Sequence, residues 1–229
     1  RQNKTIEVVD LSDNSISDTG ANSVIDTVLD RDGLLRVYLS GNPLTDFQKL
    51  PEVMARFVKT IQKDPSEKNI LFRKGVALNY LKRSDRALRC YDRVLKIDPT
   101  DVVTWNNKGN AFNKLKLWYD SLECYNTANT LDPNYGPAYY NKGNTLADLK
   151  RYQEAIQSYQ QAISLNPTQP HLYNAVALAL EAQSRYDQAL EWYDKAIALN
   201  PKSPMGYYNK GNVMLKLKCY NRAIEYYNF

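Results

Sequence analysis

Three pairs of asparagines carry the most informative polar chemistry of the chain. The members of each pair are three positions apart in the run Asn-Lys-Gly-Asn, and the pairs are Asn107 and Asn110, Asn141 and Asn144, and Asn209 and Asn212. On a helix, residues three apart share one face. An asparagine amide offers a donor and an acceptor, which matches one peptide unit of a bound main chain. The pairs therefore predict a face that binds a peptide backbone. The alternative is that these amides bond only between neighbouring parts of the protein.

Hydrogen bonds from a few amides give weak affinity, because each contributes about 0.5–1.5 kcal/mol net. Apolar side-chain contacts must supply the rest. Several large apolar residues fall on the same predicted face, and these are Phe72, Tyr140, Leu178, Tyr208 and Leu215. We predict an amide-lined surface with aromatic anchors; otherwise these are ordinary, partly exposed side chains.

A second candidate surface is basic. Residues 68–96 contain nine Lys or Arg residues and two acidic ones. Four of the basic residues follow helical spacing and form one stripe, here named the basic stripe: Arg86, Arg89, Arg93 and Lys96. Such a stripe attracts an acidic protein, a phosphate group or, as the less favoured partner, nucleic acid. The alternative is a solvated outer face.

Residues suited to catalysis are scarce. His171 is the one histidine, and no Gly-rich phosphate loop, CxxC pair or HExxH run occurs. We therefore predict no catalytic residues, no metal site, no cofactor and no enzymatic activity. Three cysteines are too few for a disulfide scaffold and suit a reducing, cytoplasmic environment. No apolar run reaches the length of a membrane span, so no membrane partner is expected.

The elements that must position these residues repeat every 34 positions. Prolines occur at Pro65, Pro99, Pro133, Pro167 and Pro201, and tyrosines at Tyr91, Tyr125, Tyr159, Tyr193 and Tyr227. Glycines occur at Gly75, Gly109, Gly143 and Gly211, with Ala177 in the remaining slot. Within 136–169, apolar residues at three- and four-residue steps predict two helices separated by a turn near Lys150. A period of this length is typical of stacked helix pairs, which approach closely at the glycine slot.

Seven slots of the period have fixed character: aromatic, small, aliphatic, alanine, aromatic, alanine and proline. They are filled by Trp105, Gly109, Phe112, Ser121, Tyr125, Ala128 and Pro133, and again by Tyr173, Ala177, Leu180, Ala189, Tyr193, Ala196 and Pro201. Residues 68–229 thus resemble the tetratricopeptide repeat, in four full units (68–101, 102–135, 136–169 and 170–203) and a partial one (204–229). The resemblance implies a mainly α, right-handed superhelix whose first helices line a concave groove for a peptide or protein partner.

The resemblance also bears on specificity. The slots of Asn107, Asn141 and Asn209 look like the asparagine ladder of O-linked N-acetylglucosamine transferase, although Arg73 and Ala175 interrupt it. This implies a protein-interaction scaffold or, alternatively, the recognition arm of an enzyme whose catalytic domain lies outside this sequence. The carboxylate clamp of chaperone-binding members is incomplete, because His171 and Ala175 replace the lysine and arginine it needs. The partial last unit further predicts self-association at that end.

Residues 1–45 follow a different pattern. Two copies of L-x-x-L-x-L-x-x-N-x-L are formed by Ile6, Val9, Leu11, Asn14 and Ile16 and by Leu34, Val37, Leu39, Asn42 and Leu44. They resemble leucine-rich repeats of the ribonuclease-inhibitor type, which implies a short α/β segment. Residues 46–67 are predicted to be a junction with a capping helix over 51–63. We expect this sequence to be part of a larger multidomain protein.

Overall fold

The structure is a computed structural model that describes residues 8–10, 36–38 and 66–228. The chain divides into two compact units, Arg1–Pro99 and Thr100–Phe229. In the first unit, strands β1 (Val8–Asp10) and β2 (Arg36–Tyr38) pair in parallel. Each residue of β1 lies opposite the one 28 positions later, which equals the interval between the two copies of the leucine-rich pattern. The other residues of 1–45 and the predicted helix over 51–63 lie outside the described residues, so both assignments stay predictions.

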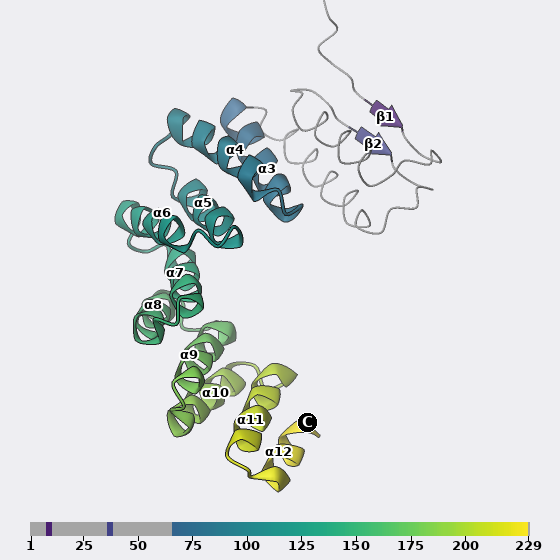
Figure 1. Cartoon of the computed structure of the whole chain (residues 1–229), viewed down its shortest axis with the longest axis vertical. Helices are drawn as coiled ribbons and strands as arrows, with labels where there is room; N and C mark the ends of the chain where they lie inside the picture. Colours follow the sequence, from purple (N-terminus) through teal and green to yellow (C-terminus); the bar gives the residue numbers. More distant parts are fainter. Residues whose placement is uncertain (1–7, 11–35, 39–65, 229) are drawn as a thin grey trace, which may run out of the picture. The chain divides into compact units, whose positions relative to one another are not determined.

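The first unit also contains one helix pair, α3 (Glu67–Tyr80) and α4 (Ser84–Ile97), drawn in blue in Figure 1. Helix α3 begins after Ser66, whose hydroxyl accepts a hydrogen bond from the backbone N–H of Asn69 and so satisfies a first-turn donor. The two helices pack through an apolar stripe, in which Tyr91 and Val94 of α4 are fully buried.

The described residues of the second unit form four helix pairs. Their helices are α5 (Val102–Lys114), α6 (Trp118–Leu131), α7 (Gly136–Asp148), α8 (Tyr152–Leu165), α9 (Pro170–Ala182), α10 (Tyr186–Leu199), α11 (Pro204–Lys216) and α12 (Tyr220–Tyr227). Consecutive helices of this unit contact each other, and α7 also contacts both α5 and α9 (Figure 1). We call α3, α5, α7, α9 and α11 the first helices and their partners the second helices. The prediction of a mainly α stack of helix pairs is confirmed.

The glycine and tyrosine slots meet inside each pair. A Cβ atom added to Gly109 would lie 2.6 Å from Cε1 of Tyr125, and one added to Gly143 would lie 2.4 Å from Cε1 of Tyr159. Both tyrosine rings are buried, with 1% and 3% exposed. The prediction that the glycine slot must be small is therefore explained by a specific contact: the ring of the second helix occupies the space that a side chain on the first helix would need.

The turn inside each pair contains a residue in the left-handed backbone region. These residues have φ near +60° and recur with the 34-residue period: Lys82, Lys116, Lys150, Ser184 and Lys218. At Lys150 the turn is closed by two backbone hydrogen bonds, from Lys150 N–H to Ala147 and from Arg151 N–H to Leu146. Glycine adopts this conformation without steric cost, whereas other L-residues do not.

Replacing Lys150 by glycine is therefore expected to stabilise the protein by up to about 1 kcal/mol. The steric relief exceeds the entropy that glycine adds to the unfolded chain. The urea midpoint, followed by circular dichroism, measures the change. Ala147→Gly is the matched control, because it places glycine inside helix α7 and should lower the midpoint. A lower midpoint for Lys150→Gly would show that the lysine side chain stabilises this turn.

Candidate functional site

The candidate site is the exposed side of the first helices α5, α7, α9 and α11, which we call the first-helix face. Side chains connect neighbouring first helices along it. Asn141 Nδ2 on α7 donates to Asn106 Oδ1 on α5 at 2.9 Å, and Asn113 Nδ2 donates to Thr145 Oγ1 at 2.8 Å. Further along, Lys216 Nζ on α11 lies 2.8 Å from Glu181 Oε1 on α9. These contacts set the spacing at which the predicted binding residues are presented.

The first asparagine of each pair is held by a bond through its nitrogen in two cases. Asn107 Nδ2 donates to the backbone carbonyl of Val103, one turn earlier, at 2.8 Å. Asn141 Nδ2 donates to Asn106, as described above. Both residues are half-buried, whereas Asn209 is buried, with 7% exposed. The ladder residues therefore differ in what they can offer, and Asn209 is the least accessible.

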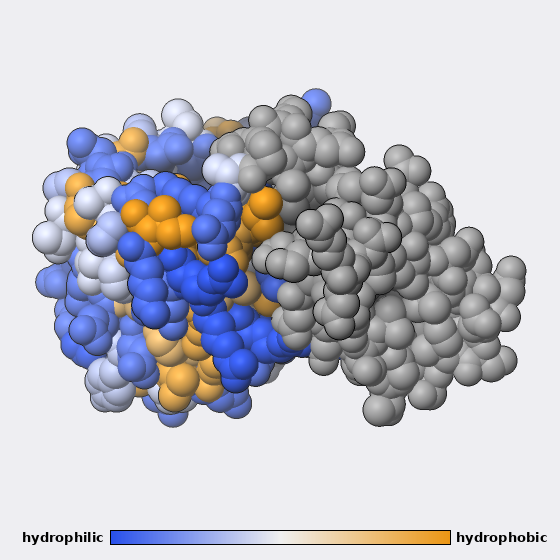
Figure 2. All heavy atoms as spheres, turned by 90° about the horizontal axis from the view of Figure 1, so that it is seen from above, coloured by the Kyte–Doolittle hydropathy of each residue, from blue (hydrophilic) through white to orange (hydrophobic). Residues whose placement is uncertain are grey.

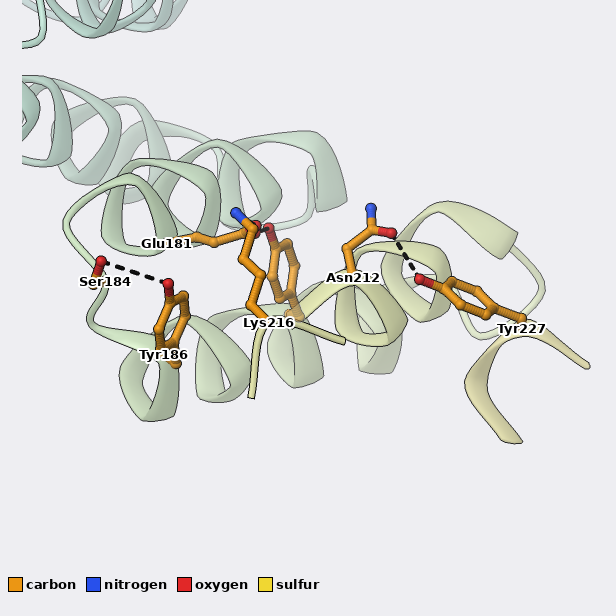
Figure 3. A network of polar contacts seen from close by, with 7 residues as sticks. Glu181, Ser184, Tyr186, Asn212, Lys216 and Tyr227 are labelled. Carbon is orange, nitrogen blue, oxygen red and sulfur yellow. Dashed lines mark hydrogen bonds and ion pairs between the residues drawn. The ribbon is translucent and has the colours of Figure 1, made fainter. Parts of the chain in front are cut away.

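The second asparagine of each pair is bound through its oxygen. Asn110 Oδ1 accepts a hydrogen bond from Tyr125 at 2.7 Å, and Asn144 Oδ1 accepts one from Tyr159 at 2.9 Å. Asn212 and Tyr227 form the same bond at 2.8 Å, seen in Figure 3. Burial raises the pKa of Tyr125 to about 12, so this phenol remains a donor at neutral pH. The sequence pattern did not reveal these partners, although each such asparagine follows a glycine that faces a tyrosine.

Two helix pairs lack this asparagine, and their tyrosines make different contacts. In the pair α3–α4, Val76 takes the asparagine position, and the hydroxyl of Tyr91 is buried without a hydrogen-bond partner among the described residues. In the pair α9–α10, Ala177 and Leu178 replace glycine and asparagine, and the Tyr193 hydroxyl donates to Glu181 Oε2 at 2.7 Å. Burial together with this hydrogen bond raises the pKa of Tyr193. Glu181 thus binds both Tyr193 and Lys216. Its contact with Lys216 is drawn in Figure 3, and this hydrogen bond raises the pKa of Lys216.

The predicted apolar anchors occupy different surroundings. Leu178 and Tyr208 are the most accessible, with 51% and 57% exposed, and Tyr208 lies 5.9 Å from the Tyr227 ring between centroids. Tyr140 is half-buried, and its ring meets His171 edge-on at 5.1 Å. Phe72 lies in the first unit, half-buried against Tyr91 at 6.3 Å. Apolar residues form separate patches among hydrophilic ones in the view of Figure 2.

The basic stripe lies along α4. Arg89, Arg93 and Lys96 are exposed and Arg86 is half-buried. Arg93 forms an exposed ion pair with Glu67 at 2.9 Å. The equivalent positions of α6, 34 residues later, are Asp120, Glu123, Thr127 and Thr130. The positive charge therefore belongs to α4 and is not a general property of the second helices.

Residues 66–228 contain no group of three or more side chains placed to hold a metal ion. Cys90 and Cys124 are buried free thiols, and Cys219 is an exposed one. Among the described helices, none combines the length and the apolar character that a membrane crossing requires.

Helix pairs that repeat every 34 residues around a glycine–tyrosine contact define a helical-repeat protein of the solenoid class. Comparison with models of known protein families identifies the repeat. The tetratricopeptide repeat family matches residues 69–101 and 136–169, a second family described as TPR repeat matches 179–218, and a third, again tetratricopeptide repeat, matches 158–191. The chain therefore carries tetratricopeptide repeats, and the resemblance predicted from sequence is confirmed for this part of the chain.

Solved structures agree with this assignment. A crystal structure of MamA is 28% identical, with a TM-score of 0.60, and the match covers 67% of this chain and 90% of MamA. MamA from Desulfovibrio magneticus RS-1 is 18% identical, with a TM-score of 0.64 over 71% and 92% of the two chains. YrrB, described as a TPR protein with an unusual peptide-binding site, is 20% identical, with a TM-score of 0.56 over 74% and 88%. The last two show likeness of fold only. No curated protein sequence matched.

Proposed function

We propose that the protein is an interaction scaffold that binds an extended peptide or protein segment on the first-helix face. The observation that carries this proposal is the state of Asn107 and Asn141. Each uses its nitrogen inside the protein, and neither Oδ1 accepts a hydrogen bond from the described residues. Half-buried amide oxygens on a face whose first helices also carry exposed apolar side chains, such as Leu178 on α9, suit a partner that offers N–H donors and apolar contacts. The peptide-binding site named for YrrB is consistent with this use of the fold.

Replacing Asn107 and Asn141 together by alanine tests the proposal. Each loss is expected to weaken peptide binding by about 0.5–1.5 kcal/mol, which is roughly a twofold to twelvefold loss of affinity for each residue. Asn126→Ala is the control, because this exposed asparagine lies on the second helix α6. Fluorescence anisotropy measures affinity, and circular dichroism confirms folding. Unchanged affinity in a folded double variant would reject binding at this face.

A second candidate function follows from the basic stripe. Its charge is confined to α4 among the second helices compared above, which favours an anionic partner at that helix. An acidic protein remains the preferred partner, and a gel shift at low salt would reveal nucleic-acid binding instead. Affinity through the stripe should fall steeply as salt is added.

The other predictions on context rest on narrower observations. The parallel pairing of β1 and β2 with a 28-residue offset supports a leucine-rich segment over 1–45. Free thiols suit a reducing, cytoplasmic location. Tyr220 and Ile224 on α12 are 59% and 57% exposed, which supports self-association through that helix. The recognition arm of an enzyme stays a hypothesis, which the sequence of the full-length protein would decide.

A further inference from the structure

We infer that the tyrosines of the second helices fix the hydrogen-bond polarity of the first-helix face. In this inference Tyr125 and Tyr159 are positioning residues that turn Asn110 and Asn144 into donors. Asn107 and Asn141 act as acceptors. The inference deepens the proposed function and rests on it, because it states which main-chain groups of a peptide each asparagine would bind.

The donor half follows from the contacts of the second asparagines. The Oδ1 atoms of Asn110 and Asn144 accept from Tyr125 and Tyr159, and these rings are buried against their glycines. An asparagine amide is planar, so fixing Oδ1 toward the tyrosine directs Nδ2 away from it. Figure 3 shows this geometry at the equivalent Asn212. The Nδ2 atoms of these asparagines form no hydrogen bond with the described residues, so their N–H groups are available to a partner carbonyl.

The acceptor half follows from the first asparagines. Asn107 donates a hydrogen bond from Nδ2 to Val103, and Asn141 donates one to Asn106. Each bond directs the other end of the amide, Oδ1, away from the bonded partner. Each of α5 and α7 therefore presents one acceptor and, three residues later on the same side, one donor. An extended peptide offers N–H and C=O groups in alternation along its main chain. The polarity of the face suits an uncharged main-chain segment and requires no terminal carboxylate.

Helix α9 interrupts this polarity. Ala175 and Leu178 occupy the two asparagine slots, and the tyrosine of this pair donates to Glu181 instead. Leu178 is half exposed, so the peptide should place an apolar side chain over α9 after its main chain has crossed α5 and α7. The ligand class is therefore an extended peptide with unblocked main-chain N–H groups over α5 and α7 and an apolar residue beyond them.

The test uses the tightest-binding peptide selected with the wild-type protein from a random library of about ten residues, the length needed to cross these helices. Asn110→Asp and Asn144→Asp keep an oxygen for the tyrosine and replace the outward donor by an acceptor. Each is expected to weaken binding about tenfold or more. Tyr125→Phe and Tyr159→Phe release the amide from its fixed orientation and should weaken binding about twofold to fivefold.

Matched controls separate orientation from packing and charge. Tyr91→Phe removes a buried tyrosine hydroxyl that has no hydrogen-bond partner among the described residues and lies on α4, outside the first-helix face, so affinity should not change. Asn126→Asp adds the same charge on the second helix α6 and should leave affinity unchanged at moderate salt. The ¹⁵N spectrum of the free protein adds a readout without ligand: Tyr125→Phe should shift the Asn110 side-chain amide signal, and Tyr193→Phe should not.

The outcomes distinguish the inference from the function beneath it. Suppose that the library yields no peptide whose binding is weakened when Asn107 and Asn141 are both replaced by alanine. Peptide binding at this face is then wrong, and the inference falls with it. If such a peptide is found but the aspartate and phenylalanine variants bind it as wild type does, the function stands and the inference is overturned. Support requires graded losses at Asn110, Asn144 and their tyrosines together with unchanged controls. A peptide methylated at the main-chain nitrogens over α5 and α7 should then bind at least about tenfold more weakly.

Discussion

Replacing Gly143 by leucine is expected to lower the free energy of unfolding by about 3 kcal/mol or more, enough to unfold the pair α7–α8. A Cβ atom at this position would lie 2.4 Å from Cε1 and 2.6 Å from Cδ1 of Tyr159. The ring cannot retreat easily, because it is 3% exposed, packs against Tyr140 at 5.9 Å and bonds Asn144. Urea unfolding followed by circular dichroism and tyrosine fluorescence measures the loss.

Gly136→Ala provides the control for this prediction. Atoms of Leu165, at 3.8 and 3.9 Å, are the nearest to a Cβ atom added there, which is ordinary van der Waals contact. Its urea midpoint should stay near that of the wild type. Gly143→Ala should be intermediate, because Ala177 is accommodated beside a buried Tyr193 in the pair α9–α10. A wild-type midpoint for Gly143→Leu would show that the helices separate more readily than this contact indicates.

Replacing Asn129 by leucine is expected to stabilise the protein by about 1–3 kcal/mol. Both Nδ2 and Oδ1 of Asn129, on α6, are buried and have no hydrogen-bond partner among the described residues. The equivalent positions of other helix pairs, at multiples of 34 residues along the chain, carry aliphatic side chains, namely Leu95, Ile163 and Ile197. Leucine would remove two unpaired polar atoms and restore the apolar contact of its neighbours. A rise in the urea midpoint and in the melting temperature would confirm the prediction.

Asn126→Leu is the matched control, because it makes the same change one turn earlier on the exposed side of α6. It should change stability by less than about 0.5 kcal/mol. If Asn129→Leu is neutral or destabilising while it remains folded, the amide must exchange hydrogen bonds with solvent or with another part of the chain. The difference between the two variants, and not either value by itself, measures the cost of burying the amide.

The sequence was sufficient to predict the helix pairs, because their determinants are local and repeated. A glycine, a tyrosine sixteen residues later and a proline after the second helix specify where two helices touch and where they end. The tyrosines at this spacing, Tyr125, Tyr159 and Tyr193, are all buried in the structure. The left-handed residue in each turn was not predicted, because lysine at Lys116 or Lys150 gives no sign of a positive φ. Nothing in those side chains replaces the usual glycine signal.

The sequence predicted which residues form the candidate site, but not which amide atom of each asparagine bonds inside the protein. The spacing of Asn107 and Asn110 indicated a shared face, yet it could not tell which amide atom is used inside the protein. That depends on the Tyr125 hydroxyl, which reaches Asn110 only after the helices have packed. A covariation inside the chain could have provided a hint. Where Val76 replaces the asparagine, the tyrosine hydroxyl has no hydrogen-bond partner in the part of the chain that the structure describes, and where Leu178 replaces it, the hydroxyl bonds Glu181.

The order of helix contacts affects how the second unit folds while it is being synthesised. Its main contacts join consecutive helices or consecutive first helices, so no pair waits for a distant segment before it can pack. Chains with such short-range contacts fold in microseconds to milliseconds, whereas a ribosome adds about 5–20 residues per second. Each pair can therefore complete its packing against the preceding one while the next is still being synthesised. Apolar surfaces such as that around Tyr193 should then stay uncovered only for the few seconds needed to translate one further repeat.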